Sequence, residues 1–426
     1  MAASLLLRNV VHEGHVTDVR IDHGLFTAID EQPPDAVADL VIDAQGRLAI
    51  VPPFYNSHTH AAMTLLRGYA EDLELATWLT DHIWPAEATL TADDIYAGTR
   101  LAILEMIKSG TVFFNDMYWE QPATVRAALE LGVRAQVGLL YITGPDGRPN
   151  PRSAASNAAL LELEPDLPSR ITVAHAPHSP YTVDRNQLEW IGADSADTGR
   201  PIHTHAAETA SEVQDCLATH GATPIAYLDR LGLVNERSVL AHCVHLTDDD
   251  RWTIADRGAV IAHMPVSNLK LCSGFFEHER ALEAGCQVVL GTDGAASNNS
   301  LSMLAEMKSA ALLAKSQAGS PLAGRDHVML AAATREAALA FGIDGGVIEV
   351  GRVADALLVD LDHHTMVGDY SLTANLVYSA EPDVIDTVIC DGHVLMQHRR
   401  VAGEGEIVAA ARETCARLAR DRHRRG

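Results

Sequence analysis

Short apolar segments separated by polar turns mark both ends of the chain. In the N-terminal part, Gly, Asp and Pro break these segments, as is typical of small antiparallel strands; they span residues 4–10, 16–21, 25–29 and 40–42. The pattern returns at 351–360, 387–390 and 393–396, and a helical stretch follows at 406–422. Each group alone has too few strands to bury a face, so we expect the two ends to pair in one small β-sandwich.

Between these ends, apolar runs alternate with segments of helical period. The first run leads into His58, and the others lie at 111–115, 134–141, 171–175, 201–205, 238–242, 259–263 and 287–291. Helix-period segments such as 97–108, 122–130, 212–220 and 301–313 separate them. Eight such strand–helix units over roughly 290 residues predict a (β/α)₈ barrel, whose typical size is about 250 residues.

The predicted fold class is therefore α/β: a (β/α)₈ TIM barrel with a small β-sandwich domain formed by the N- and C-terminal segments. We expect residues 1–52 to form the first part of the sandwich, residues 53–345 the barrel, and residues 346–426 the second part of the sandwich with a C-terminal helix. With 426 residues, 47% of them hydrophobic, the chain can bury a large core.

Composition excludes several classes of partner. The net charge of −25 repels phosphate backbones and anionic lipid surfaces, so we expect neither nucleic acid nor a membrane as a partner. No apolar run approaches the ~20 residues of a membrane span. The six cysteines include no C-x-x-C pair, which argues against a disulfide framework and a cysteine zinc site. With no leader pattern in residues 1–10, these features predict a soluble, cytoplasmic protein.

Histidine and carboxylate residues stand where several predicted strands end. His58 and His60 follow an apolar run, and residues two apart in a strand point to one face about 6–7 Å apart, so both imidazoles can converge on one ion. The later strand ends add His203, His205, Glu208, His242 and Asp293. Since parallel barrel strands deliver their carboxyl ends to one rim, the sequence predicts a metal site there.

Five longer motifs extend this pattern. They are residues 58–68, beginning His-Thr-His; 84–87, Trp-Pro-Ala-Glu; 175–181, His-Ala-Pro-His-Ser-Pro-Tyr; 267–271, Ser-Asn-Leu-Lys-Leu; and 291–299, beginning Gly-Thr-Asp-Gly. Together they resemble the methylthioadenosine/S-adenosylhomocysteine deaminase branch of the amidohydrolase superfamily, which is related to triazine chlorohydrolases. The resemblance covers nearly the whole chain. One departure is Pro52-Pro53-Phe54, where the family usually has Pro-Gly-Phe.

The resemblance implies a metal centre of four ligands, His58, His60, His205 and Asp293, with Zn²⁺ as the expected ion. Three imidazole nitrogens and a carboxylate oxygen suit zinc on chemical grounds too, and Fe²⁺ or Mn²⁺ would also fit. Dinuclear relatives use a carboxylated Lys on the fourth strand, but residues 171–181 contain no Lys, so we expect one metal per subunit. The remaining barrel histidines, which we expect to pack inside the barrel or behind the ligands, are His175, His203, His245 and His263.

The catalytic roles also follow from the resemblance. Glu208 would act as the proton shuttle, and His242 and Asp293 would orient and deprotonate the attacking water. Water attacks the ring carbon that carries the amine, Glu208 protonates the adjacent ring nitrogen, and ammonia leaves. The predicted activity is that of a zinc-dependent aminohydrolase acting on C–N bonds of cyclic amidines.

Four residues are predicted to contact the substrate. His178 matches a substrate-contacting histidine of the family, and Glu87 matches a carboxylate that would hold the ribose hydroxyls. Relatives active on S-adenosylhomocysteine carry an Arg on the third strand, where this chain has Leu139; Arg148 or Arg152 in the following segment could substitute. Otherwise we expect a neutral 5′ group, as in methylthioadenosine, 5′-deoxyadenosine or adenosine.

Other functions stay open at the level of sequence. An s-triazine chlorohydrolase, a guanine- or 8-oxoguanine-type deaminase and a cyclic-amide hydrolase use the same scaffold, and a non-catalytic metal-binding protein is a more distant alternative. Glu208 with Asp293 favours deamination, and Glu87 with His178 favours a nucleoside over a free base. The resemblance also implies a homo-oligomer, either a dimer or a tetramer.

Overall fold

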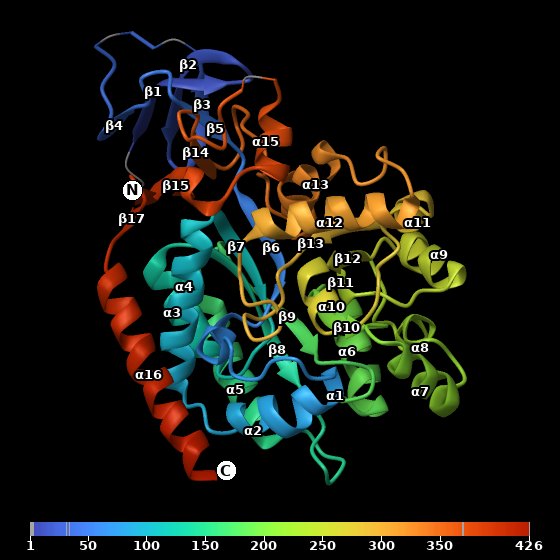
Figure 1. Ribbon diagram of the computed structural model, residues 1–426. Helices are drawn as coiled ribbons and strands as arrows, with labels where there is room; N and C mark the ends of the chain where they lie inside the picture. The colour runs from blue at the N-terminus through green and yellow to red at the C-terminus, as the bar shows by residue number, and fades with distance from the viewer. Residues whose placement is uncertain (1–3, 31, 34, 369, 426) are drawn as a thin grey trace.

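The molecule contains two β-sheets: one forms the wall of a barrel, and the other lies beside that barrel (Figure 1). The computed structural model describes residues 4–425 except 31, 34 and 369. Residues 1–3 and 426, which the predicted sandwich includes, lie outside this description. In Figure 1 the outer sheet lies at the top and the barrel below it.

The barrel sheet has eight parallel strands in sequence order. They are β6 (Phe54–Thr59), β7 (Thr111–Asp116), β8 (Arg134–Tyr141), β9 (Ile171–Pro177), β10 (Ile202–Ala206), β11 (Ser238–His242), β12 (Val260–His263) and β13 (Gln287–Leu290). The amides of Thr292 and Asp293, just after β13, donate to the carbonyl of His58 in β6 at 3.2 and 3.0 Å. These bonds close the barrel and bring the last strand end beside the first.

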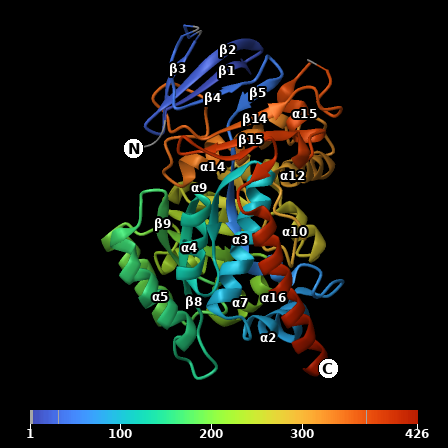
Figure 2. The ribbon, with the colours of Figure 1, turned by 90° about the vertical axis from the view of Figure 1, so that its left-hand side faces the viewer.

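Helices surround the barrel, as the alternation of apolar runs and helical periods predicts (Figure 2). They are α3 (Ala92–Lys108), α4 (Gln121–Leu131), α5 (Pro151–Leu163), α6 (Arg185–Thr198), α7 (Ala210–His220), α8 (Pro224–Arg230), α9 (Asp248–Arg257), α11 (His278–Glu283), α12 (Met303–Ala318), α13 (Asp326–Ala333) and α14 (Arg335–Ala340). Several begin with side-chain caps: in α3, Thr91 and Asp94 form a reciprocal capping box that satisfies free amides of the first turn.

Short helical segments lie at the rim where the strands end. They are η1 (Ala61–Leu66), α1 (Leu75–Thr77), the π-helical η2 (Trp78–Ile83), α2 (Trp84–Glu87) and α10 (Pro265–Lys270). η1 begins directly after His60, and its six residues are all buried. These segments cover the end of the barrel that carries the predicted site.

The outer sheet joins both ends of the chain. Its N-terminal strands are β1 (Leu5–His12), β2 (His15–Asp22), β3 (Leu25–Ile29), β4 (Leu40–Asp43) and β5 (Leu48–Val51); its C-terminal strands are β14 (Ala356–Asp360), β15 (Ile385–Cys390), β16 (His393–Gln397) and β17 (Arg400–Val401). β5 pairs antiparallel with β14, with Val51 opposite Leu357. The sheet is mixed, because β1 runs parallel to β4 and β5.

The C-terminal part also includes the short helices α15 (Leu372–Tyr378) and η4 (Pro382–Val384), whereas the short helix η3 (Glu164–Asp166) follows α5 in the barrel. The long helix α16 (Glu404–Arg425) runs down the outside of the barrel beside α3 (Figure 2). Arg417 of α16 pairs with Asp94 of α3 at 2.5 Å. The C-terminal helix therefore belongs to the barrel wall as much as to the outer sheet.

The predicted fold class is confirmed: an eight-stranded parallel barrel stands beside a β-sheet built from both terminal segments. The structure resolves that β part as one continuous mixed sheet of nine strands. The division of the chain at residues 52 and 346 stays a prediction. Among the described residues, none of the helices combines the length and the hydropathy that crossing a membrane requires.

Candidate metal centre and active site

Four predicted ligands meet at the carboxyl ends of the barrel strands. His58 lies near the end of β6, His60 follows that strand, His205 lies in β10, and Asp293 comes three residues after β13. His58 has no exposed surface, and His205 and Asp293 are buried as well. Barrel closure thus joins side chains that are up to 235 positions apart in sequence.

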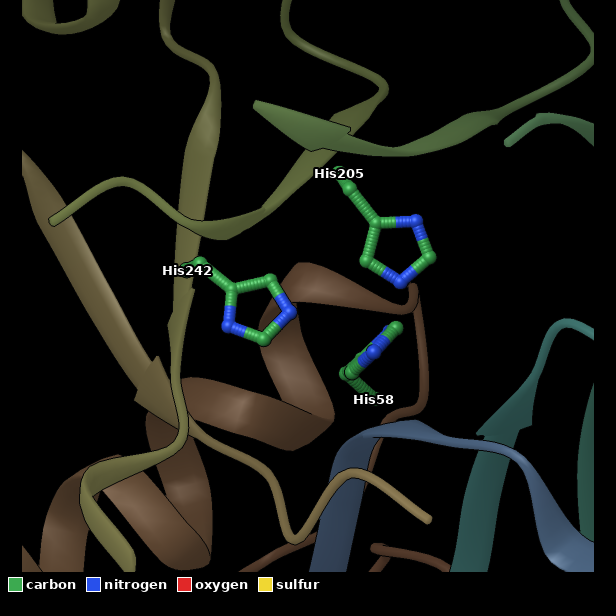
Figure 3. Close-up of side chains that lie close together, drawn as sticks. All are labelled: His58, His205 and His242. Carbon is green, nitrogen blue, oxygen red and sulfur yellow. The ribbon is translucent and has the colours of Figure 1, made fainter. Parts of the chain in front are cut away.

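Their side chains face a common point. The Oδ1 atom of Asp293 lies 3.4 Å from Nε2 of His58 and 3.3 Å from Nε2 of His60. The Nε2 atoms of His60 and His205 are 3.3 Å apart. Ligand atoms of His58, His205 and His242 also lie within 4.8 Å of one another, and Figure 3 shows these three rings pointing toward one another.

Hydrogen bonds at the far side of each ring fix its orientation. Nδ1 of His60 lies 2.5 Å from the carbonyl oxygen of Met117, and Nδ1 of His205 lies 2.5 Å from that of His178. Because a carbonyl can only accept, both rings carry their proton on Nδ1 and present the Nε2 lone pair to the centre. This is the tautomer that a metal ligand needs.

His58 provides the test of whether a cation fits. Its Nδ1 lies 2.7 Å from Nε2 of His203, while its fully buried Nε2 has no hydrogen-bond partner. An unpaired buried polar atom is costly, and this one faces a carboxylate and two imidazoles. Three nitrogen donors and one oxygen donor around this point match the ligand set of a divalent transition metal such as zinc.

Hydrogen-bond donors surround the carboxylate of Asp293. Its Oδ2 accepts hydrogen bonds from Ser267 Oγ at 2.6 Å and Ser297 Oγ at 2.9 Å, and its Oδ1 accepts one from the amide of Gly294 at 2.8 Å. Burial alone would raise the pKa of Asp293, but the imidazoles of His58 and His60 outweigh it and hold the pKa well below its ordinary value. The negative charge that a cation requires is therefore available.

Backbone conformation at the strand ends is unusual. Ala207, His242, Cys243 and Asp293 all have left-handed φ angles between 50° and 73° although none is glycine. Such residues carry conformational strain and cluster at sites where the chain must aim a side chain. Here the turns direct the side chains at the ends of β10, β11 and β13 across the barrel mouth.

Glu208 and His242 form a second pair beside the cluster. Oε2 of Glu208 lies 3.7 Å from Nε2 of His242, and Oε1 accepts a hydrogen bond from Ser273 at 3.2 Å. On its other side, His242 Nδ1 lies 2.8 Å from Oδ1 of Asn268. Burial raises the pKa of Glu208, which favours its protonated form. Burial would lower the pKa of His242, but Glu208 and Asp293 raise it overall.

The pocket above these groups has a mixed lining. Its polar residues are His60, Glu87, His178, His205, Glu208, His242 and Asp293. Its apolar and aromatic residues come largely from the rim segments and include Trp78, Leu79, Trp84, Met117, Trp119, Leu140 and Tyr181. Such a pocket suits a flat heterocycle with a few polar attachment points.

Glu87 and His178 also line this pocket, and the His178 ring packs against that of His205 with centroids 4.8 Å apart. Glu87 is 5% exposed, its Oε2 accepts a hydrogen bond from Trp119 Nε1 at 3.2 Å, and burial raises its pKa. His178 contacts the hydroxyl of Thr182 through Nδ1 at 3.0 Å. Burial lowers the pKa of His178 to about 3, so the ring is a neutral hydrogen-bonding group.

The two predicted arginines differ in position. Arg152 begins α5 and lines a cavity of about 710 Å³ that shares Glu87 and His178 with the first pocket. Its guanidinium pairs with Glu120 at 2.9 Å and stacks 4.9 Å from the centre of the Trp119 ring. Arg148 is exposed on a turn and is not among the residues that line either cavity. Leu139 lies buried in β8.

Of the histidines expected outside the ligand set, His203 contacts His58 directly, as given above. His175 bonds the Tyr141 hydroxyl at 2.9 Å and Asp194 at 2.8 Å. His245 contacts the carbonyl of Ser273 at 2.6 Å. β9, which holds His175, contains no Lys.

Sequence reasoning missed the polar residues that hydrogen-bond to the candidate catalytic side chains. Ser267, Asn268, Ser273 and Ser297 bond Asp293, His242 and Glu208, as described above. Three of these four lie inside the motifs at 267–271 and 291–299; Ser297 bonds Asp293 four residues before it, whereas the partners of the other three lie at the ends of other strands. For Ser267, Asn268 and Ser273, only the packing of the barrel strands brings the side chain to its partner.

Comparison with known proteins gives one family and several close relatives. The family model described as the amidohydrolase family matches residues 49–395. A 5′-deoxyadenosine deaminase of Methanospirillum hungatei is 45% identical over 379 residues, which cover 88% of this chain and 84% of the relative. A 5-methylthioadenosine/S-adenosylhomocysteine deaminase of Moorella thermoacetica is 43% identical over 368 residues, or 85% of each chain.

Among solved structures, an adenosine deaminase from Xanthomonas campestris with bound zinc superposes with a TM-score of 0.90. It is 34% identical, and the match covers 97% of this chain and 98% of that one. The similarity therefore extends over the barrel and the outer sheet together.

Proposed function

Because the chain belongs to the amidohydrolase family, we propose that its barrel carries a metal-dependent hydrolytic deaminase of adenosine-type nucleosides. The substrates are 5′-methylthioadenosine, 5′-deoxyadenosine, adenosine or S-adenosylhomocysteine, and the products are the inosine analogue and ammonia. One observation carries the proposal: a single pocket contains a cluster of metal-binding type, a buried carboxyl and a pair of groups suited to a ribose. The relatives named above, both nucleoside deaminases, support it.

The proposed metal site uses His58, His60, His205 and Asp293, with one Zn²⁺ per subunit; Fe²⁺ or Mn²⁺ would suit the same donors. When bound there, such an ion supplies Lewis-acid activation of water, whose pKa falls toward ~7 on zinc. Asp293 would also take the proton that the attacking water loses. That proton then leaves with the amine as ammonia.

Glu208 delivers the second proton in this scheme. Its burial favours the protonated carboxyl, which can protonate the ring nitrogen next to the amine-bearing carbon while water adds to that carbon. His242 is fixed by Asn268 at Nδ1, so its Nε2 faces Glu208 and orients the water. Collapse of the tetrahedral adduct returns its hydroxyl proton to Glu208, expels ammonia and leaves a carbonyl on the ring.

Glu87 and His178 distinguish a nucleoside from a free base or a triazine. The carboxylate of Glu87 can accept hydrogen bonds from two ribose hydroxyls, and the neutral imidazole of His178 can contact the ring. The second cavity begins at these two residues and would receive the 5′ group. A free base or an s-triazine would leave it empty.

The test is a substrate panel with zinc-loaded protein. It contains methylthioadenosine, 5′-deoxyadenosine, S-adenosylhomocysteine, adenosine, guanine, 8-oxoguanine and a chlorotriazine, and follows ammonia or chloride release with product mass. We expect turnover of the adenosine compounds and loss of turnover after chelation, restored by zinc. Turnover of only a free base or the triazine would contradict the nucleoside assignment.

The matched variant is Glu208→Gln, which keeps the shape of the side chain and removes its proton. We expect kcat to fall by about 10²- to 10⁴-fold, since that is the usual contribution of a general acid. Zinc content should equal that of the wild type, because Glu208 is not in the proposed ligand set. Unchanged kcat would contradict the proton-shuttle role.

Assembly and compartment are further parts of the proposal. We propose a homo-oligomer, either a dimer or a tetramer, which light scattering of the purified protein tests. A cytoplasmic location is consistent with the six free cysteines of the structure, because unpaired thiols suit a reducing compartment.

A further inference from the structure

Glu212 is a buried carboxylate that the proposed mechanism does not use. It lies in the first turn of α7 and is 8% exposed. Its Oε1 accepts a hydrogen bond from the amide of Ala207 at 2.8 Å, and its Oε2 accepts one from the amide of Glu208 at 2.7 Å. The two oxygens of Glu212 therefore accept hydrogen bonds from two consecutive amides, and the second of these belongs to Glu208, the proposed proton shuttle.

This arrangement differs from an ordinary helix cap. Thr209 caps α7 in the usual way, since its side chain accepts a hydrogen bond from the amide of Glu212 at 3.2 Å. In a capping box the acidic residue at this position would bond the amide of the capping residue itself. Besides the Thr209 amide, Glu212 bonds the amides of the two residues before it, so its contacts stabilise the turn between β10 and α7.

That turn is strained and fully enclosed. Ala207 has a left-handed φ of 52° and no exposed surface. The carbonyl of Ala206 accepts a hydrogen bond from the amide of Cys243 at 3.0 Å, and the carbonyl of Ala207 accepts one from the amide of His245 at 2.9 Å. The loop after β11 thus donates hydrogen bonds to the carbonyls of the turn, and Glu212 accepts hydrogen bonds from the amides of the same turn.

The turn decides where Glu208 points. From this backbone the Glu208 carboxyl reaches Ser273 at 3.2 Å and faces His242 at 3.7 Å. We propose that Glu212 is a positioning residue of the deamination, which fixes the Ala207–Glu208 backbone so that the Glu208 carboxyl faces the substrate ring. The inference rests on the proposed function, because it gives Glu208 its task.

A carboxylate is suited to this role in a way that an amide is not, and the backbone donors offset part of the burial that raises the Glu212 pKa to about 7. Both of its oxygens accept, which matches two parallel N–H donors. In Glu212→Gln the side-chain NH₂ group would face one of the two amides, donor against donor. The turn loses one hydrogen bond and must shift, while the size of the side chain stays the same.

The experiment measures kcat and KM of zinc-loaded Glu212→Gln with the best nucleoside of the wild-type panel. We expect kcat to fall by about 10²-fold, the cost of a misplacement of about 1 Å, with KM changed by less than about threefold. Zinc content should equal that of the wild type. The control is Asp215→Asn on the exposed side of α7, which removes the same charge from the same helix and should leave kcat unchanged.

A double-mutant cycle separates positioning from general destabilisation. If Glu212 acts through Glu208, then Glu208→Gln/Glu212→Gln has the kcat of Glu208→Gln alone, whereas independent losses would multiply. Glu212→Asp, whose shorter side chain cannot span both amides, decides the matter if the Gln variant does not fold, and it should lower kcat similarly.

The outcomes are distinct. A wild type inert on every nucleoside contradicts the proposed function. An active wild type whose Glu212 variants retain kcat, or lose it multiplicatively with Glu208→Gln, contradicts only the role of Glu212.

Discussion

Glu306 is a single buried residue that connects two loops of the candidate site through hydrogen bonds. It lies in α12 with no exposed surface. Its Oε1 accepts a hydrogen bond from Asn298 at 2.6 Å, and its Oε2 accepts one from the amide of Val266 at 3.2 Å. Asn298 in turn donates to the carbonyl of Thr292, next to Asp293. Burial raises the pKa of Glu306 to about 8 from its ordinary value of 4.5.

A pH dependence of stability follows. A carboxyl with a raised pKa binds a proton more tightly in the folded state, so its stabilising contribution is complete below pH 4.5 and is lost as pH rises through about 8. Glu306→Gln mimics the neutral form and lacks this dependence. We therefore expect the wild-type Tm, measured against that of Glu306→Gln, to decline between pH 5 and pH 8 in thermal unfolding scans.

The control for this measurement is Glu283→Gln, which removes an exposed carboxyl on α11. Its Tm should run parallel to that of the wild type over the same pH range. A constant difference between wild type and Glu306→Gln would show that Glu306 binds its proton equally well in the folded and unfolded states.

At the scale of elements, the packing of α3 against η1 supports the proposed metal site. A Cβ atom at Gly98 of α3 would lie 2.7 Å from the carbonyl oxygen of Ala62 and 2.9 Å from Leu65. Thr64 donates a hydrogen bond to the carbonyl of Gly98 at 2.7 Å. Since η1 begins directly after His60, the position of this ligand depends on how closely the two helices approach.

Gly98→Ala should therefore weaken the protein. Alanine gains up to about 1 kcal/mol of helix propensity over glycine, but overpacking against a backbone atom costs typically 1–3 kcal/mol. We expect a net loss of stability in urea unfolding and a lower zinc occupancy after dialysis. Gly405→Ala in α16 is the matched control, because a Cβ there meets nothing within 4 Å; equal effects of the two substitutions would contradict the role of close packing.

At the scale of the whole molecule, a buried ion pair joins the barrel to the outer sheet. Arg134 at the start of β8 bonds Asp355 before β14 through Nε at 2.8 Å and Nη2 at 3.1 Å. Asp355 has no exposed surface and also accepts hydrogen bonds from the Tyr55 hydroxyl and the Asp391 amide. The two sheets are thus linked through one carboxylate.

Asp355→Asn leaves the Arg134 charge buried with part of its partner removed. Breaking such a pair costs about 3–5 kcal/mol, so we expect a large decrease in the free energy of unfolding by denaturant titration. Glu189→Gln, which opens the exposed pair with Arg185 on α6, is the control and should change stability little. A similar effect of both changes would show that Asp355 does not hold the sheets together.

The sequence by itself determined the strands, their order and the chemistry at their ends. A buried strand in a parallel barrel is apolar on both faces, so each run stood out locally, and the residue after each run had to lie on the common rim. This is why His58, His60, His205 and Asp293 could be named together before any contact was known. The nucleoside deaminase resemblance, carried by local motifs, agrees with the relatives at 45% and 43% identity.

The tertiary structure alone decided which side chains support those groups. Glu212 reaches back four residues along a left-handed turn, and the sequence around it predicts only a helix start. Asn268 and Ser267 meet His242 and Asp293 across strands, and Arg134 meets Asp355 across 221 positions. Periodicity reports the burial of one element at a time, whereas these contacts depend on how the barrel closes and how the outer sheet docks, which no local pattern encodes.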